Sequence, residues 1–402
     1  MNTDAQGFRR FICVYLCLSV VPLSSADWPM FRFNPARTGA ADAVAGPDRP
    51  AVLWTYRDEK VRLAEFTSSP AISDGRLYIG CENRNVFARD GAVMCLHAAT
   101  GRLIWHVKTA QPVFSSPAVA NGRVYVGEGL HENKDSVFRC LDAQTGKLLW
   151  QFTVASHAES SPAVADGRVY FGAGEDGIYC LDAATGRKIW HVPGHHIDDA
   201  PVVVDGRVYV GTGYEKPRLL VLDAATGKAL WEKPTPASVW GSAAIADGRV
   251  YFGISSATIG GEDTRRIGKV YCLGAADGKE LWTFTPDHGI GGSLVVDKAD
   301  VLAGCWDGRL YCLDAATGRK KWQVELGGPV FSSPALDERH LHIGTDDGRI
   351  LALRRDTGQT QWTVTLERWL PEGTRILSSP ALVNGHLYIG TGSNLVVCIR
   401  RP

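Results

Sequence analysis

Seven tryptophans recur along the chain at nearly constant intervals, and this periodicity constrains the fold more than any other feature. They are Trp105, Trp150, Trp190, Trp231, Trp282, Trp322 and Trp362, with spacings of 45, 40, 41, 51, 40 and 40 residues. Each tryptophan closes a unit of similar sequence, of which residues 160–190 are the clearest copy: SSPAVADGRVYFGAGEDGIYCLDAATGRKIW. Internal similarity at this period predicts an array, a solenoid or a propeller.

The unit at 160–190 divides into four short apolar segments separated by turn signals. Asp166-Gly167 separates the first two, AGEDG the next two and ATG the last two. Asp-Gly between apolar runs favours a tight hairpin, because glycine accepts the positive φ that the turn needs. Strands this short cannot form a core alone, so each four-stranded sheet must pack on its neighbours. The predicted fold is therefore all-β, a propeller of four-stranded antiparallel blades. The flat tryptophan on the last strand is expected to fill the wedge between blades and to cap the preceding turn.

The two ends of the chain together predict how the ring closes. An eighth unit begins at Ser378 and ends at Pro402 without a fourth strand or a tryptophan. The segment 51–57, AVLWTYR, is a single apolar strand that contains a tryptophan, Trp54, but it belongs to no complete unit. We expect it to complete the last sheet and close an eight-bladed ring, which removes exposed edges; the alternative is an open array. Residues 51–402 would then form one domain, and residues 27–50 an irregular lead-in laid across one face.

The first 26 residues are predicted to be a signal peptide. Arg9 and Arg10 precede an apolar run at 11–21, and small residues lead to a cleavage position after Ala26. The run is shorter than the roughly 20 residues that span a bilayer, and we predict no transmembrane segment; an uncleaved anchor is the alternative. The protein is expected in the periplasm or outside the cell. With 43 basic and 43 acidic residues, no nucleic-acid partner is expected.

Ten cysteines in an exported protein suggest disulfides, but their positions argue against them. Six occupy one repeat position, the third-strand YCLDA motif, where other units carry valine or alanine: Cys95, Cys140, Cys180, Cys272, Cys312 and Cys398. Equivalent positions on neighbouring blades are about 10 Å apart, whereas a disulfide needs Cα atoms within about 7 Å. Cys81 and Cys305 lie too far apart around the ring. We therefore predict free, buried thiols.

The repeated motif, SPAV, DGRVYVG, YCLDA, TGK and LW in order, resembles the PQQ-type repeats of quinoprotein dehydrogenases. It equally resembles the non-catalytic barrel-assembly propellers of the BamB type. The opening DWPMFRFNPARTG, 27–39, resembles the start of many exported proteins with these repeats. The dehydrogenase resemblance implies a quinone in the central funnel, a calcium ion, a catalytic aspartate and adjacent cysteines. No two cysteines are adjacent here, so the non-catalytic branch is favoured and no cofactor is predicted. PQQ and calcium belong only to the alternative, a PQQ-dependent oxidoreductase.

Departures from the repeat indicate where a site would lie. The loops between second and third strands are long at 81–92, 128–136 and 254–268, and residues leading into the innermost strands vary. Candidate binding residues gather there in units three to five: His157, Glu159, His195, His196, Asp198, Asp199 and Trp240. Imidazoles and carboxylates can hold a cation and tryptophan can stack on a ring, whereas the alternative is a solvated rim. No metal is assigned, because adjacent histidines followed by adjacent aspartates define no ligand geometry. Trp306 and Trp369, with Trp240, are further candidates if the partner is a carbohydrate.

The sequence thus favours an exported, non-enzymatic propeller that binds a protein or a small ligand through its loop face. A scaffold for barrel assembly is one form of this function. The protein would act as a monomer or within an envelope assembly.

Overall fold

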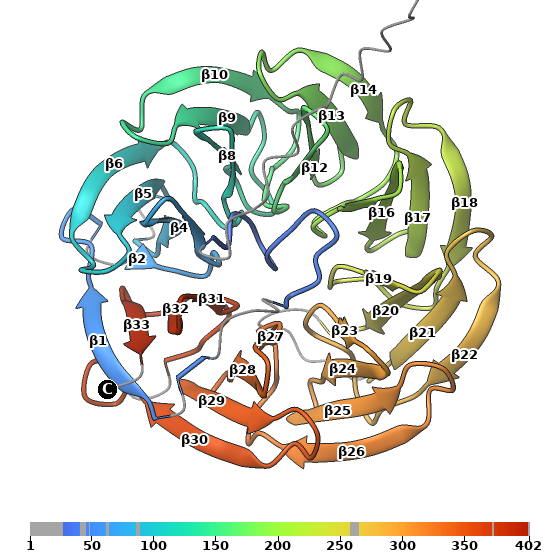
Figure 1. The fold of residues 1–402 in the computed structure, drawn as a ribbon. Helices are drawn as coiled ribbons and strands as arrows, with labels where there is room; N and C mark the ends of the chain where they lie inside the picture. Colours follow the sequence, from blue (N-terminus) through green and yellow to red (C-terminus); the bar gives the residue numbers. More distant parts are fainter. Residues whose placement is uncertain are drawn as a thin grey trace, which may run out of the picture.

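The computed structural model describes residues 27–40, 46–47, 49–61, 64–85, 89–257, 265–371 and 374–400. These residues form eight antiparallel sheets arranged as blades around a central axis (Figure 1). The all-β class and the eight-bladed propeller are thereby confirmed. The predicted signal peptide, 1–26, with Cys13 and Cys17, lies outside the described residues. None of the described residues belongs to a helix that could cross a membrane.

Each blade runs outward from a short inner strand to a longer outer strand. Blade 1 contains β2 (Ala64–Glu65), β3 (Ala71–Ser73), β4 (Arg76–Asn83), β5 (Gly91–His97) and β6 (Leu103–Thr109). Blade 2 contains β7 (Ala118–Ala120), β8 (Arg123–Gly127), β9 (Val137–Asp142) and β10 (Leu148–Thr153). Blade 3 contains β11 (Ala163–Ala165), β12 (Arg168–Gly172), β13 (Ile178–Asp182) and β14 (Lys188–Val192). Blade 4 contains β15 (Val202–Val204), β16 (Arg207–Thr212), β17 (Arg218–Asp223) and β18 (Ala229–Pro234).

The second half of the ring repeats this order. Blade 5 contains β19 (Ala244–Ala246), β20 (Arg249–Ser255), β21 (Gly268–Gly274) and β22 (Glu280–Phe284). Blade 6 contains β23 (Val295–Asp297), β24 (Asp300–Gly304), β25 (Arg309–Asp314) and β26 (Lys320–Glu325). Blade 7 contains β27 (Ala335–Leu336), β28 (His340–Gly344), β29 (Arg349–Arg354) and β30 (Thr360–Thr365). Blade 8 contains β31 (Ala381–Val383), β32 (His386–Gly390), β33 (Val396–Arg400) and, from the other end of the chain, β1 (Ala51–Tyr56).

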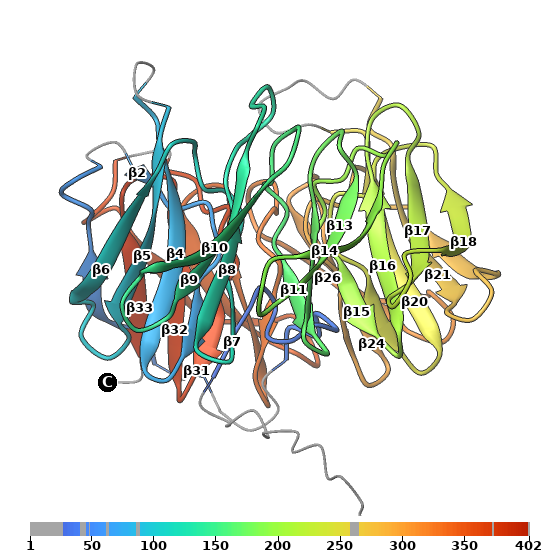
Figure 2. The same cartoon turned by 90° about the horizontal axis from the view of Figure 1, so that it is seen from above.

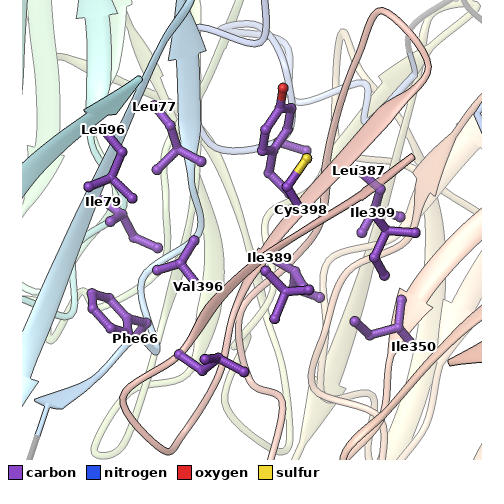
Figure 3. Packing of buried hydrophobic residues seen from close by; sticks show 14 of the residues in the cluster. Phe66, Leu77, Ile79, Leu96, Ile350, Leu387, Ile389, Val396, Cys398 and Ile399 are labelled. Atoms are coloured by element: carbon purple, nitrogen blue, oxygen red, sulfur yellow. The ribbon is translucent and has the colours of Figure 1, made fainter. Parts of the chain in front are cut away.

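Blade 8 closes the ring as the sequence predicts. β1 pairs antiparallel with β33, with Trp54 opposite Cys398 and Tyr56 opposite Val396. Figure 3 shows the core on this blade, where Val396 lies near Ile79 of blade 1 and Ile399 lies near Ile350 of blade 7. The N-terminal strand therefore supplies the outer edge of the last sheet. Blades 1 and 7 both pack on that sheet.

Adjacent blades are joined by a recurrent set of hydrogen bonds to one backbone carbonyl. Between blades 3 and 4, the Ala224 carbonyl accepts from Arg168 Nη1 at 2.9 Å, Tyr170 Oη at 3.2 Å and Trp190 Nε1 at 3.1 Å. The same Trp190 ring covers Gly227, whose φ is +72° and whose absent Cβ would lie 2.8 Å from ring atom Cδ2. The repeated residues of the DGRVY, LDAATG and LW motifs thus solve one packing problem between two blades.

The tryptophan caps the turn of the following blade, which corrects the expectation that it caps the preceding turn. Indole Nε1 donates to an alanine carbonyl of the next blade at 3.0–3.2 Å in six copies: Trp54 to Ala98, Trp105 to Ala143, Trp150 to Ala183, Trp190 to Ala224, Trp231 to Ala275 and Trp282 to Ala315. Trp362 instead donates to the Pro47 carbonyl at 2.6 Å. In blade 8 the third strand, β33, and the outer strand, β1, come from opposite ends of the chain, so no turn connects them. The lead-in takes the place of this missing turn.

The two faces of the ring carry different loops. The ATG and Asp-Gly turns share one face, the ATG face, and Asp166 and Gly167 both have positive φ, as a tight hairpin turn requires. The loops between second and third strands share the other face, the loop face, with the connections between blades. Isolated bridges join these two kinds of loop, including Gly174 to Ile197 and Ser238 to Ser255. Figure 2 shows the β8–β9 loop extending from the loop face.

All eight described cysteines are free and buried, as predicted. Burial raises the pKa of each thiol in the third-strand positions, to about 12 for Cys140 and Cys180. They act as small apolar side chains within the blade contacts, for example Cys180 opposite Trp190.

Candidate functional site

A cavity of about 200 Å³ lies on the axis of the ring. Each blade contributes the residue that precedes its Ser-Ser-Pro motif or the equivalent position. In blade order these are Thr67, Phe114, Glu159, Asp198, Trp240, Gly291, Phe331 and Leu377. Two neighbouring blades thus present carboxylates, and blades 7 and 8, across the axis, present Phe331 and Leu377. The wall is acidic on one side and apolar on the other.

A second ring of residues below this wall is held by serine hydroxyls. Backbone N–H groups donate to serine Oγ atoms of the next blade, as from Ser69 to Ser116 at 2.9 Å and from Ser116 to Ser161 at 3.0 Å. Blade 4 interrupts the ring, because Ala200 stands where the other blades have serine. In the same blade Asp199 replaces the first serine of the motif and accepts from Gly211 N–H at 2.9 Å.

Asp199 is a buried carboxylate with a structural set of partners. Ser242 Oγ donates to it at 3.4 Å, and the Arg37 guanidinium is nearby. Burial raises the pKa of Asp199 to about 7, against the opposing effects of the Gly211 and Ala200 N–H groups and of Arg37. Asp199 lines the cavity, as a binding residue should, but its oxygens are already used to join blades 4 and 5.

The lead-in closes the cavity on the ATG face. It crosses the centre of the ring (Figure 1) and places Phe31 in the cavity lining. The buried Arg37 side chain donates to the Ser161 carbonyl at 2.8 Å, the Pro162 carbonyl at 2.9 Å and the Pro201 carbonyl at 3.3 Å. These bonds join the lead-in to blades 3 and 4. The cavity therefore opens toward the loop face.

At the mouth of the cavity, three imidazoles surround one carboxylate; we call His131, His157, His196 and Asp198 the His cluster. His157 Nε2 lies 2.9 Å from Asp198 Oδ1, and His196 Nε2 lies 2.7 Å from Asp198 Oδ2. His131 Nε2 is 3.6 Å from Asp198 Oδ2 and 3.5 Å from Glu159 Oε1. One candidate ligand atom from each of the four residues lies within 4.8 Å of the other three.

The electrostatics of the cluster favour an ionised Asp198 beside a Glu159 that holds its proton more strongly. Burial raises the pKa of Asp198, but hydrogen bonds from His157 and His196 outweigh it and lower the pKa to about 2. Burial, and then the Asp198 charge, raise the pKa of Glu159 well above its ordinary value. Burial lowers the pKa of His131, against the attraction of Asp198. Asp198 is therefore the member of the cluster that carries the negative charge.

The candidate residues from the sequence separate into three groups. His157, Glu159, His196 and Asp198 come together, and Trp240 joins them through Tyr214, whose ring is 5.7 Å from Trp240 and 4.5 Å from His196. Asp199 and Trp306 line the cavity but lie outside the cluster.

Two candidates lie elsewhere. His195 lines a second pocket on the loop face, which it shares with His131 and His196 of the cluster, but its ring is not among the converging ligand atoms. Trp369 lies between β30 and β31, half-buried against the blade 7–8 core, and does not line the central cavity. Sequence analysis omitted His131 and Tyr214. His131 lies in the long loop 128–136, so the length of this loop was the sequence feature that could have revealed it. Which blade His131 faces depends on the closed ring.

Comparisons with known proteins agree with this architecture. A sequence profile described as outer membrane protein assembly factor BamB matches residues 42–129, 133–265 and 266–401, which is most of the chain. The chain belongs to this family. No curated protein matches it significantly.

Solved structures share the fold at low identity. BamB from Moraxella catarrhalis has 16% identity and a TM-score of 0.68 and covers 87% of this chain and 97% of its own. A quinohemoprotein alcohol dehydrogenase from Comamonas testosteroni has 18% identity and a TM-score of 0.72. The match covers 94% of this chain and 82% of the dehydrogenase. A europium-containing methanol dehydrogenase has 14% identity and a TM-score of 0.71. The match covers 94% of this chain and 98% of that enzyme. At this identity the likeness concerns the fold alone, and it extends to BamB and to two dehydrogenases alike.

Proposed function

We propose that this family member is an exported, non-enzymatic propeller that binds a protein partner through its loop face, as a scaffold in the cell envelope. One observation carries the proposal: the non-repeated residues face one side, whereas the repeated residues of the ATG face hold the blades together. A surface whose side chains already bond neighbouring blades has few groups left for a partner. The loop face has long loops, the His cluster and the exposed Tyr214, and variable loops on a rigid scaffold commonly carry binding functions.

The family description and the predicted signal peptide support the cellular setting. The matching profile is described as an outer membrane protein assembly factor. An export signal at 1–26 would bring this chain to the envelope, where such a factor acts. We infer a role in assembly or maintenance of envelope proteins.

The chemistry of the central cavity argues against a quinone cofactor. PQQ carries three carboxylates, and the described residues that line the cavity include Glu159, Asp198 and Asp199 but no lysine or arginine. Addition of PQQ and calcium to the purified protein should therefore give no bound chromophore; a stoichiometric quinone spectrum that survives gel filtration would favour the oxidoreductase.

Site-specific photocrosslinking in cells tests the protein-binding proposal. A photoreactive residue at Tyr214 reports on the loop face, and one at Thr226, an exposed residue of the ATG turn in the same blade, is the matched control. We expect a discrete crosslinked protein from position 214, absent from position 226 and lost when loop 128–136 is shortened. Crosslinks only from position 226, or no change on loop shortening, would refute the assignment of the loop face.

A small polar ligand is a second candidate function, favoured by two indole donors. Nε1 of Trp240 and of Trp306 is buried without a hydrogen-bond partner among the described residues, and both rings line the cavity. Carbohydrates combine hydroxyl acceptors with an apolar ring face that can pack on tryptophan. Quenching of tryptophan fluorescence by sugars, lost in Trp240→Phe, would support it, and unchanged fluorescence would exclude this ligand class.

A further inference from the structure

The His cluster has the composition and the convergence of a metal centre. We propose that His131, His157, His196 and Asp198 bind one divalent transition-metal ion, with Zn²⁺ as the best-matched ion. The proposal goes beyond partner binding and does not depend on it, because metal binding is measured on the purified protein alone.

The four ligands come from three separate connections of the loop face. His131 lies in the β8–β9 loop, His157 between β10 and β11, and His196 and Asp198 between β14 and β15. Neighbouring backbone holds them in place: Ile197, between the last two ligands, exchanges two hydrogen bonds with Gly174 at 2.9 and 3.1 Å. The positions are thus defined by blade packing rather than by one mobile loop.

The donor set selects the class of ion. Three imidazole nitrogens and one carboxylate suit first-row transition metals, and a four-coordinate set of this kind is typical of zinc. Calcium and magnesium prefer six or more oxygen ligands, which the cluster does not offer. Asp198 supplies the negative charge that partly neutralises a dication, and Glu159, 3.5 Å from His131, stands beside it.

A chain of polar groups supports the ligand His157 from behind. Its Nδ1 lies 3.1 Å from Ser156 Oγ, and Ser156 Oγ lies 3.4 Å from Glu175 Oε2. When Nδ1 carries the proton and donates to Ser156, Nε2 presents its lone pair to the ion. Such outer partners orient metal-binding histidines in many sites.

A second histidine–aspartate group in the same protein shows what a structural cluster looks like. Asp337 accepts from His342 Nε2 at 2.8 Å and also from the backbone N–H groups of Gly46, Arg339 and His340, all at 2.7 Å. Its oxygens are saturated, and the group anchors the lead-in. Asp198 differs, because among the described residues its carboxylate accepts only from imidazoles, and because the third imidazole, His131, makes no hydrogen bond.

The cluster needs only a small contraction to enclose an ion. Tetrahedral ligands at about 2.0–2.1 Å from zinc lie about 3.3 Å apart, against separations of at most 4.8 Å here. The ring that moves most is His131, whose side chain is 43% exposed, whereas His157 is 2% exposed. His131 already stacks on His196, with ring centroids 5.4 Å apart. A loop-borne imidazole therefore completes a set of three ligands that are already in place.

Metal titration of the untagged protein tests the proposal. Calorimetry with ZnCl₂ should show one site, CaCl₂ and MgCl₂ should give no heat at the same concentrations, and Co²⁺ should give visible absorption of a tetrahedral site. His131→Gln and His157→Gln should each weaken Zn²⁺ binding by at least about 100-fold, beyond the 10–100-fold typical of outer-shell changes. Ser156→Ala should weaken it by about 10-fold.

Matched variants separate this site from adventitious binding. His195→Gln removes the adjacent histidine outside the cluster and should leave Zn²⁺ affinity unchanged, and circular dichroism should confirm that all variants fold. His131 is exposed, so its variant tests the site even if His157→Gln does not fold. No Zn²⁺ binding by the wild-type protein, or equal loss in His195→Gln and His131→Gln, would overturn the proposal.

Discussion

Replacing Gly186 by alanine should destabilise the protein more than replacing Gly167, although both glycines lie in blade 3 and have nearly the same φ. The values are +73° and +71°. A Cβ at position 186 would lie 2.6 Å from two atoms of the Trp150 indole, whereas a Cβ at position 167 would meet nothing within 4 Å. The pair therefore separates backbone strain from loss of the contact between blades.

The magnitudes follow from these geometries. A left-handed conformation costs an L-residue about 1–2 kcal/mol, which is the whole effect expected for Gly167→Ala. Gly186→Ala adds steric overlap with a ring held by its bond to Ala183, and overpacking typically costs about 1–3 kcal/mol. We expect a total of about 2–5 kcal/mol for Gly186→Ala.

A double-mutant cycle measures the contact directly. Chemical denaturation followed by circular dichroism gives the unfolding free energy of the wild type, Gly186→Ala, Trp150→Ala and the double variant. In the Trp150→Ala background the indole is gone, so Gly186→Ala should cost only the backbone strain. The coupling energy should be about 1–3 kcal/mol. Equal destabilisation by Gly167→Ala and Gly186→Ala, with no coupling energy, would show that the packing of the Trp150 indole does not require a glycine at position 186.

Three further predictions concern closure, pH and thiols. Deleting residues 51–57 should abolish the cooperative melting transition, because β33 loses its partner; a truncated monomer that melts at the parental temperature contradicts the closed ring. Burial, and then Glu65, raise the pKa of Glu82 to about 7, so the folded state favours its protonated form. Its stabilising contribution is complete below about pH 4.5 and is lost as pH rises to 7, by up to about 3 kcal/mol; Glu82→Gln should flatten this part of the stability–pH curve, and an unchanged slope argues against a buried Glu82. The eight buried thiols should resist alkylation in the native protein and react on unfolding, as mass spectrometry would show; rapid labelling of Cys140 without denaturant is the contrary result.

The fold was predictable because it is a local solution repeated eight times. Each Asp-Gly turn, each ATG turn and each tryptophan occurs at a constant offset, so one unit read correctly predicts the others. Even closure followed from the chain ends, since a sheet without a fourth strand and a strand without a sheet complete each other. The direction of the tryptophan contact did not follow, because a periodic sequence has the same offsets toward both neighbouring blades.

The candidate site was only partly predictable for the opposite reason. His157, His196 and Asp198 stood out as departures from the repeat, and they do meet. His131 lies in a different blade and loop, and its distance from Asp198 depends on how the β8–β9 loop folds over the ring. His195, one residue from His196, lines the same loop-face pocket, but its ring does not join the four ligand atoms around Asp198.

The sequence by itself determined the blade, the number of blades and the way the ring closes, since these depend on turn chemistry and apolar patterning within some 40 residues. Only the tertiary structure decided which side chains share a site. The cavity wall takes one residue from every blade, and the His cluster joins three connections far apart in the chain. Their proximity arises from the curvature of the closed ring, which brings equivalent positions of all eight blades to one axis.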